Sequence, residues 1–405
     1  NYTKPMKIMA QASGFAIATK GGTSATMTVD IYRNPELSTT GSGNWTTYTA
    51  NYSNVYNGSK LYYFDSMLNS NGVLVHHVSI SGYEGYIKAS ESDLLPMIYV
   101  ENQLPFVLKR GTGTQSFAKT NFNSYKVVDS GNGYNELYFF YQAVGTNGNW
   151  IGPYAKSPDW LKPGITYYSL DGITFYTDPY FKNVVNNGSK FYNYYQYLPL
   201  RSMSNLTGAQ LDNYLKALGR TTSIYYGKSK AFVEGQTKYG MNALLVFAMA
   251  GIESAFGTST IARTKNNLFG WGAIDSAPGE NASVYPTVEA SILQQMGVNL
   301  FGYLNVSDWR FTGPGLGNKG SGFNTKYASD PNWGLGIATV AYKTDKYNGF
   351  QDLNYYKLGI LNDRANINVR AQASTASVTY YNTRGADKQL INQSVAVTKE
   401  KNNFY

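Results

Sequence analysis

Residues 242–253 read Asn-Ala-Leu-Leu-Val-Phe-Ala-Met-Ala-Gly-Ile-Glu, an apolar run that ends in one carboxylate. Nearly every position is apolar, so the run predicts a helix that is buried on all sides and belongs to a core. We expect the helix to end in the Ser-Ala-Phe-Gly stretch that follows. Glu253 would then feel both an apolar surrounding and the negative end of the helix dipole, and both raise the pKa of a carboxyl group.

A glutamic acid that stays protonated near neutral pH can donate a proton to a glycosidic oxygen. A capping or ion-paired glutamate at a helix end is the structural alternative for Glu253. The apolar pattern by itself supports the two interpretations about equally.

Helical spacing continues on both sides of this run. Leu211, Tyr214, Leu215 and Leu218 recur at helical spacing, and Gly219 is placed to end that helix. Further helices are expected at residues 228–239, 288–304 and 333–347, with a hairpin or small lobe at 271–286.

The remainder of the chain has β character. Residues 1–96 consist of short β-branched and aromatic runs between Gly, Asn and Ser clusters, which predicts a small β-barrel or sandwich. Residues 97–166 form a second β unit or a linker domain, with a strand at 138–142. An Asp-Gly turn at 171–172 predicts a hairpin that opens a mainly helical domain at 167–350, and residues 351–405 return to β character. The predicted fold class is α+β, with several domains.

Composition limits the chemistry. The chain has 405 residues, which favours several domains, and it has no cysteine, which excludes disulfides, thiolate nucleophiles and cysteine-ligated metals. The two histidines, His76 and His77, are adjacent in a strand-like run, so their side chains face opposite ways and cannot easily share a metal ion. We therefore expect neither a metal nor a cofactor.

Charge and hydropathy indicate which kinds of molecule the chain is expected to bind. The net charge is +9, yet no dense Lys/Arg run occurs, which argues against nucleic acid and suits a polyanionic cell wall rich in teichoic acid. No apolar stretch approaches the roughly 18 to 20 residues of a membrane-spanning helix, and no signal peptide precedes Asn1, so we expect a mature or excised chain without a membrane span. The 37 tyrosines suit sugar rings, although a tyrosine-rich β-sheet surface explains most of them.

The residues around Glu253 resemble a known family. Residues 251–259, 261–262 and 266–271 are similar to the central motif of the bacterial glucosaminidases, glycoside hydrolase family 73, in the lysozyme-like superfamily. Residues 192–202, 317–324 and 327–334 resemble further elements of a Gram-positive autolysin branch. The resemblance covers residues 167–347. It implies a lysozyme-like domain with a small β lobe in a secreted, wall-associated enzyme that hydrolyses the β-1,4 bond after N-acetylglucosamine in peptidoglycan. We expect a monomer.

The resemblance also implies catalytic roles. Glu253 would be the general acid, and Tyr327 would approach the reacting sugar from the opposite side of the groove, with simple packing as the alternative for Tyr327. Asp275 and Glu280, in the lobe, are candidates for a second acid, Asp275 being slightly preferred, although each could be a solvated loop charge. The acetamido group of the substrate could also attack in place of a second acid.

The expected substrate-binding residues have structural alternatives too. Asn266 and Asn267 would bond sugar hydroxyls or turn the chain after a helix. Phe269 and Trp271 would be aromatic walls of the groove or would pack in the core. Tyr285 is a further expected substrate-binding residue. For Asp330 we favour a structural anchor at a helix start over contact with the sugar.

Three short runs, at residues 29–35, 82–89 and 367–375, resemble strands of bacterial SH3-like wall-binding modules, the last module being partial. Such modules would concentrate the enzyme at the wall, so residues 167–347 alone should cleave soluble glycan as well as the full chain does and act poorly on intact walls. The rival functions are a lytic transglycosylase or muramidase on the same scaffold and a non-catalytic wall-binding adhesin.

Overall fold

The computed structural model describes residues 6–8, 14–20, 27–37, 51–110, 113–273, 281–361, 367–382 and 392–399. The chain forms two compact units. The first comprises Asn1–Tyr192, Asn318–Gly320 and Asn324–Asn332, and the second comprises Asn193–Gly317, Ser321–Phe323 and Trp333–Tyr405. From Tyr192 onward the chain therefore passes between the units five times, at positions that were not predicted as domain boundaries.

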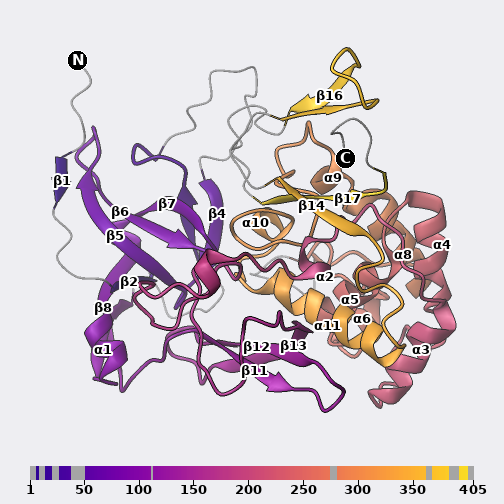
Figure 1. Cartoon of the computed structure of the whole chain (residues 1–405), viewed down its shortest axis with the longest axis horizontal. Helices are drawn as coiled ribbons and strands as arrows, with labels where there is room; N and C mark the ends of the chain where they lie inside the picture. The colour runs from indigo at the N-terminus through magenta and orange to yellow at the C-terminus, as the bar shows by residue number, and fades with distance from the viewer. Residues whose placement is uncertain are drawn as a thin grey trace. The chain divides into compact units, whose positions relative to one another are not determined.

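The first unit contains an eight-stranded antiparallel sheet in the order β4-β3-β7-β6-β5-β2-β8, with β1 paired to β5 (Figure 1). Its strands are β1 (Met6–Ile8), β2 (Gly14–Ala18), β3 (Thr28–Tyr32), β4 (Asn51–Tyr56), β5 (Lys60–Leu68), β6 (Leu74–Ile80), β7 (Tyr83–Lys88) and β8 (Ser92–Pro96). Alternate residues of β7 are buried, as expected when one face of a strand covers a core. That core includes Val29, Ile31, Tyr52, Val78 and Ile87.

The two histidines lie on β6 and have different surroundings. His76 is buried, and its Nδ1 shares a hydrogen bond of 2.7 Å with Ser66 Oγ. His77 lies 3.9 Å from Asp65 Oδ1 and 3.6 Å from Glu84 Oε2. The two imidazoles are thus engaged separately.

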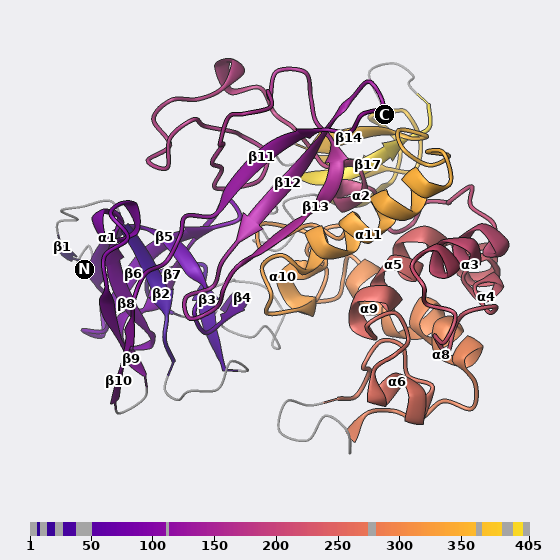
Figure 2. The same ribbon diagram turned by 90° about the horizontal axis from the view of Figure 1, so that it is seen from below.

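A short helix and smaller β elements follow in the first unit. They are α1 (Met97–Glu101), the hairpin β9 (Phe106–Arg110) with β10 (Gly113–Phe117), and a three-stranded sheet of β11 (Ser124–Asp129), β12 (Asn135–Tyr141) and β13 (Asn149–Lys156), seen in Figure 2. The strand predicted at 138–142 is confirmed as part of β12. The predicted Asp-Gly hairpin is also confirmed, because Tyr168 and Tyr176 exchange two backbone hydrogen bonds of 2.8 Å.

Helices dominate the second unit. They are α2 (Tyr194–Tyr197), α3 (Gly208–Ala217), α4 (Lys230–Tyr239), α5 (Ala243–Glu253), α6 (Thr260–Lys265), α8 (Val288–Gln294), α9 (Phe301–Leu304) and α11 (Trp333–Tyr347), while α10 (Asn324–Tyr327) belongs to the first unit. The helices predicted at 228–239, 242–253 and 333–347 are confirmed. The single helix predicted at 288–304 is wrong, since a π-helical turn at Gln295–Asn299 divides it.

The core of the second unit surrounds α5. Helix α11 packs along α5, and α4 contacts it as well (Figure 1). The rings of Tyr225, Phe232 and Phe247 meet edge to face with centroids 5.6 to 6.0 Å apart, an arrangement that aromatic rings prefer. This packing explains why residues 242–253 carry no polar face.

The C-terminal strands also belong to the second unit. β14 (Lys357–Leu361) pairs with β17 (Gln393–Val397), and β15 (Asn368–Arg370) pairs with β16 (Thr379–Asn382). The run at 367–375 that resembles an SH3-like strand therefore includes β15. The mixed α and β architecture is confirmed, and the SH3-like character of its β elements stays a proposal.

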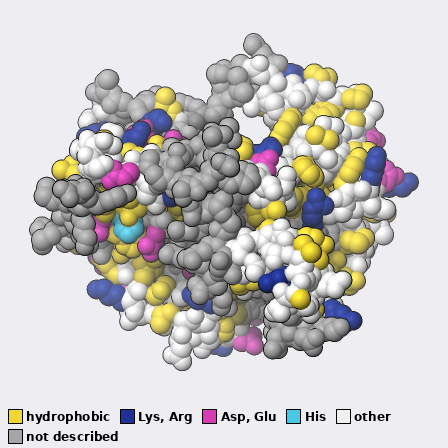
Figure 3. Space-filling model, turned by 90° about the horizontal axis from the view of Figure 1, so that it is seen from above, with side chains coloured by type: hydrophobic (Ala, Val, Ile, Leu, Met, Phe, Trp, Pro, Cys, Tyr) yellow, Lys and Arg dark blue, Asp and Glu magenta, His cyan; other side chains and the backbone are white. Residues whose placement is uncertain are grey.

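The surface agrees with the diffuse charge expected from composition. Figure 3 shows lysine and arginine side chains scattered over the face that it draws, between neutral polar and hydrophobic atoms. No dense basic patch gathers among the described residues on that face.

Candidate active site

Glu253 is the last residue of a helix that the core holds firmly. Asn242 caps α5: its side-chain oxygen accepts a hydrogen bond from the N–H of Leu245 at 3.0 Å, and its own N–H donates to the carbonyl of Leu200 at 2.8 Å. Residues 243–251 are all buried, as predicted. A helix that is fixed at its start and along its length gives the side chain at its end a rigid support.

The surroundings of Glu253 favour the protonated carboxyl group. Burial raises the pKa of Glu253 from 4.5 to about 7. One hydrogen bond opposes this effect: the indole N–H of Trp333 donates to Glu253 Oε1 at 2.7 Å and lowers the pKa. The carboxyl group therefore exists in both its acid and its base form near neutral pH, which suits a general acid.

Trp333 is a site residue to which the sequence analysis assigned no role. It is the first residue of α11, and only 5% of its surface is exposed. It lies in the 327–334 stretch that resembles the autolysin branch. A buried tryptophan generally needs an acceptor for its N–H, so that stretch contained a usable signal.

The turn after Glu253 has an unusual backbone. Ala255, Phe256 and Gly257 have successive positive φ angles of 51°, 56° and 70°, and the Ser254 hydroxyl accepts a hydrogen bond from the N–H of Gly257 at 2.8 Å. A Cβ atom on Gly257 would lie 2.5 Å from Ser223 Oγ. Glycine is required there for both its φ angle and its size. The two strained non-glycine residues follow the candidate acid at the second and third positions, and such strain is typical of a functional site.

The side chains of Asn266 and Asn267 bond the backbone of the adjacent lobe. Asn266 ends α6 in the left-handed conformation and donates to the carbonyl of Tyr285 at 3.0 Å. Asn267 is 1% exposed, and its side-chain amide donates to the carbonyls of Trp271 and Ser283, both at 2.9 Å. These bonds agree with the interpretation that both residues turn the chain after a helix. Sugar binding by either residue stays a prediction.

The three aromatic candidates differ in exposure. Phe269 is 4% exposed and packs in the core, which is the alternative given for it from sequence. Trp271 and Tyr285 are half-buried. They come from the two sides of the lobe, which are joined by the bonds from Ser283 N–H to Trp271 O at 2.8 Å and from Tyr285 N–H to Lys265 O at 2.9 Å. Trp271 and Tyr285 therefore remain the aromatic candidates for a sugar contact.

The remaining predicted residues are not brought together with Glu253 by the described contacts. Asp275 and Glu280 lie outside the described residues. Tyr327 ends α10 and is half-buried in the first unit. Asp330 Oδ1 accepts a hydrogen bond from the N–H of Asn332 at 2.8 Å, immediately before α11, which is the anchoring position favoured from sequence.

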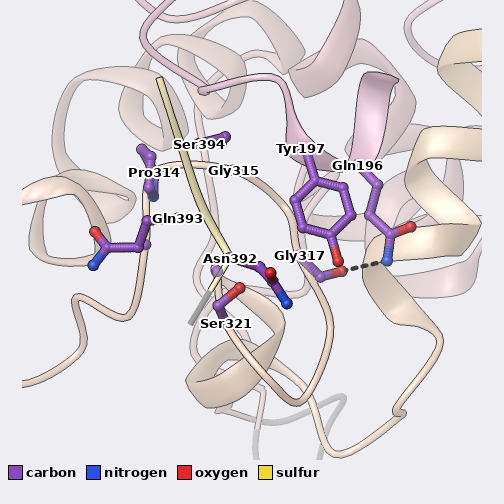
Figure 4. A pocket seen from close by; sticks show the side chains of 11 residues that line it. Gln196, Tyr197, Pro314, Gly315, Gly317, Ser321, Asn392, Gln393 and Ser394 are labelled. Atoms are coloured by element: carbon purple, nitrogen blue, oxygen red, sulfur yellow. Dashed lines mark hydrogen bonds between the residues drawn. The ribbon is translucent and has the colours of Figure 1, made fainter. Parts of the chain in front are cut away.

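A small pocket lies elsewhere in the second unit. Figure 4 shows it between the glycine-rich residues 313–322, strand β17 and α2, where the side-chain amide of Gln196 donates to the carbonyl of Gly317 at 2.8 Å. Its volume is about 10 Å³, close to the smallest cavity that holds one water molecule. A sugar ring cannot enter it, so we regard this pocket as structural.

The described part of the chain meets neither the requirements of a metal site nor those of a membrane-spanning helix. Within residues 6–399 outside the gaps given above, no three histidine or acidic side chains gather where they could hold a metal ion. None of the helices described there combines the length and the apolar character that crossing a membrane requires.

Residues 229–346 match the model of the glucosaminidase family, described as mannosyl-glycoprotein endo-beta-N-acetylglucosaminidase. The chain contains a domain of this family. The glucosaminidase domain includes α5 with Glu253, the lobe with Asn267 and Trp271, and the start of α11 with Trp333. It also includes Tyr327, so its sequence contributes to both compact units.

The alignments with curated relatives cover more residues of the chain than the glucosaminidase domain contains. A protein of Streptococcus pneumoniae serotype 4 named "Putative endo-beta-N-acetylglucosaminidase" is 34% identical over 213 residues, which are 53% of this chain and 30% of that protein. A "Beta-N-acetylglucosaminidase" of Bacillus subtilis is 30% identical over 138 residues, which are 31% of this chain and 15% of that protein. The chain thus spans less than a third of the length of these relatives.

Solved autolysins show weaker similarity. A catalytic mutant of S. aureus autolysin E in complex with the disaccharide NAG-NAM is 22% identical, and the match covers 38% of this chain and 73% of that chain with a TM-score of 0.29. A major bifunctional autolysin is 21% identical, with coverages of 38% and 68% and a TM-score of 0.30. These TM-scores are too low to support a shared architecture, so the lysozyme-like description of the glucosaminidase domain stays a proposal.

Proposed function

We propose that this chain is a peptidoglycan hydrolase, an endo-β-N-acetylglucosaminidase that cleaves the β-1,4 bond after N-acetylglucosamine with Glu253 as general acid. The observation that carries the proposal is the carboxyl group of Glu253, which stands at the end of a buried helix and whose pKa is raised to about 7 by burial. The glucosaminidase domain at residues 229–346 supports the choice of bond.

The hydrogen bond from Trp333 suggests how the proton is presented. Because Glu253 Oε1 accepts the indole N–H, Oε2 is the oxygen left to carry the proton. Oε2 would give this proton to the leaving glycosidic oxygen while positive charge develops on the sugar ring. The resulting carboxylate keeps its hydrogen bond to Trp333, which stabilises the charge that the transfer creates.

The group on the other side of the sugar is proposed from the resemblance. In our preferred scheme the acetamido oxygen of the substrate attacks the anomeric carbon, and Tyr327 stabilises the developing positive charge. A water molecule then displaces the acetamido oxygen from the opposite side of the anomeric carbon, so the product retains its configuration. In the alternative scheme Asp275 or Glu280 activates a water molecule on the far face, and the configuration inverts.

Replacement of Glu253 by Gln tests the proposed acid. Glu253→Gln removes the donated proton without changing size, so it should lower the rate on purified sacculi by several orders of magnitude while the fold is kept. Glu234→Gln is the matched control, because Glu234 lies on α4 with 54% of its side chain exposed. Substantial lysis by a folded Glu253→Gln protein would rule out Glu253 as the acid.

Product analysis separates the rival functions. Mass spectrometry of the released muropeptides should find N-acetylglucosamine at the new reducing end. A muramidase would leave N-acetylmuramic acid there, and a lytic transglycosylase would leave its anhydro form. If wild-type protein binds sacculi and releases no muropeptides, the adhesin interpretation is correct.

The flanking β regions are proposed to bind the wall. The runs that resemble SH3-like strands overlap β3, β7 and β15, and the net charge of +9 suits a wall that contains teichoic acid. With peptidoglycan as substrate, we propose a secreted, wall-associated enzyme that acts as a monomer without a metal ion or cofactor. Wall association would raise the local concentration of the catalyst without changing its chemistry.

A further inference from the structure

The segment that carries Tyr327 is built into the N-terminal β unit. Asn318–Gly320 and Asn324–Asn332 belong to this unit, although the preceding stretch Asn193–Gly317 belongs to the other one. Helix α10 packs against strand β4 of the large sheet. Tyr327, which we propose to face the reacting sugar, is therefore supported by a sheet that lies far earlier in the chain. The two hydrogen bonds that join this sheet to the segment span 268 and 272 positions of sequence.

Two adjacent residues of β4 hold this segment by its backbone. The hydroxyl of Tyr52 donates to the carbonyl of Gly320 at 2.7 Å, and the hydroxyl of Ser53 donates to the carbonyl of Thr325 at 2.6 Å. Both donors are buried. Buried carbonyls require a donor, and here the sheet supplies it to both.

Tyr52 is itself held in place. Its ring stacks on Tyr83 of β7 with centroids 3.7 Å apart and planes 12° apart, and the guanidinium carbon of Arg33 lies 4.6 Å from the ring centroid. The side chain is fully buried, and burial raises its pKa to about 12, so the phenol remains a donor throughout the neutral range. A buried ring held by these two contacts aims its hydroxyl in one direction.

The segment also has an internal brace. Lys319 is fully buried, and its ammonium group donates to the carbonyl of Asn324 at 3.1 Å and to the carbonyl of Ala328. These two carbonyls lie on either side of Tyr327 in sequence. Thr325 closes the loop by donating from its hydroxyl to the carbonyl of Asn318 at 3.2 Å.

We propose that Tyr52 is a positioning residue for Tyr327: through Gly320 and the Lys319 brace, the β unit sets the place of Tyr327 and so takes part in catalysis in addition to wall binding. The proposal rests on the role proposed for Tyr327 above. A displacement of about 1 Å of a catalytic group can lower a rate by on the order of a hundredfold. Loss of one anchor of the segment should therefore reduce kcat on soluble glycan fragments, which need no wall binding.

A double-mutant cycle tests this coupling. Tyr52→Phe removes one hydroxyl and keeps the ring stack, and we expect kcat on soluble glycan to fall roughly tenfold while KM changes little. In the Tyr327→Phe background the same change should have almost no further effect, because the group that Tyr52 positions is already absent. Tyr167→Phe is the matched control: Tyr167 is also buried in this unit, its hydroxyl accepts from the N–H of Lys162 at 2.8 Å, and it does not contact the Tyr327 segment in any described bond. The control should keep wild-type kcat.

Each other outcome decides against one proposal. An unchanged kcat in Tyr52→Phe, or an equal loss in the wild-type and Tyr327→Phe backgrounds, overturns the positioning role. A fully active Tyr327→Phe overturns it as well and leaves Glu253 as acid, whereas an active Glu253→Gln removes the proposed function itself. Ser53→Ala, which deletes the bond to Thr325, repeats the cycle if Tyr52→Phe does not fold.

Discussion

The raised pKa of Glu253 makes a prediction about stability that does not depend on the substrate. Between pH 4.5 and about 7 the unfolded chain loses the Glu253 proton while the folded protein keeps it, so stability falls as pH rises through this window. Below pH 4.5 both states are protonated, and above about 7 the penalty is constant. The difference of 2.5 pH units corresponds to about 3 kcal/mol at most, and to less because the half-buried carboxyl group retains some contact with water.

Glu253→Gln lacks this titration, so it should be more stable than the wild type by about 1 to 3 kcal/mol at pH 8 and nearly equal to it at pH 4. Hydrogen exchange of the amides in α5 measures the opening free energy of this core separately from the first unit. Glu234→Gln, on the exposed face of α4, should show no such pH-dependent gain. The same difference at pH 4 and pH 8, or a loss of stability at pH 8, would refute the reasoning.

Three further predictions follow from the site. Trp333→Phe removes the donor that lowers the pKa of Glu253, so the basic limb of the kcat/KM profile should move up by about 1 to 2 pH units; a limb that stays in place contradicts the role of this bond. Gly257→Ala should cost roughly 2 to 4 kcal/mol in urea unfolding, against about 1 for Gly219→Ala, because both have positive φ angles but a Cβ on Gly219 meets nothing within 4 Å. NMR should show a retained anomer as the first product, with moderate losses in Asp275→Asn and Glu280→Gln; an inverted anomer together with one inactive lobe variant would exclude attack by the acetamido group.

The expectation for an isolated catalytic fragment changes with the structure. Sequence analysis predicted that residues 167–347 alone would cleave soluble glycan as well as the full chain. That fragment lacks β4, and with it the hydroxyl groups that bond Gly320 and Thr325. We now expect it to be impaired on soluble glycan as well, because module boundaries inferred from sequence assume that each module holds its own segments.

The sequence by itself determined the buried helix α5 and the position of the proposed acid at its end. An uninterrupted apolar run can be satisfied only inside a core, so residues 242–253 specify a buried helix and place a half-buried carboxyl group at its end. Local patterns of the same kind determined α4, α11 and the Asp-Gly hairpin. The resemblance carried by residues 251–271 pointed to the proposed reaction, because those residues are close together in the chain.

Only the tertiary structure decided which groups form hydrogen bonds with the residues of the proposed site. The indole of Trp333 reaches Glu253 across 80 positions of sequence, and the hydroxyl of Tyr52 reaches Gly320 across 268. Neither pair has a periodic pattern or a shared motif, and each depends on how separate elements pack. The side-chain amide of Asn267 could bond either a sugar or the backbone, and the packing of the lobe gave it the carbonyls of Trp271 and Ser283. Burial follows from local composition, but the choice of hydrogen-bond partner depends on three-dimensional proximity, which a single sequence does not encode in any local pattern.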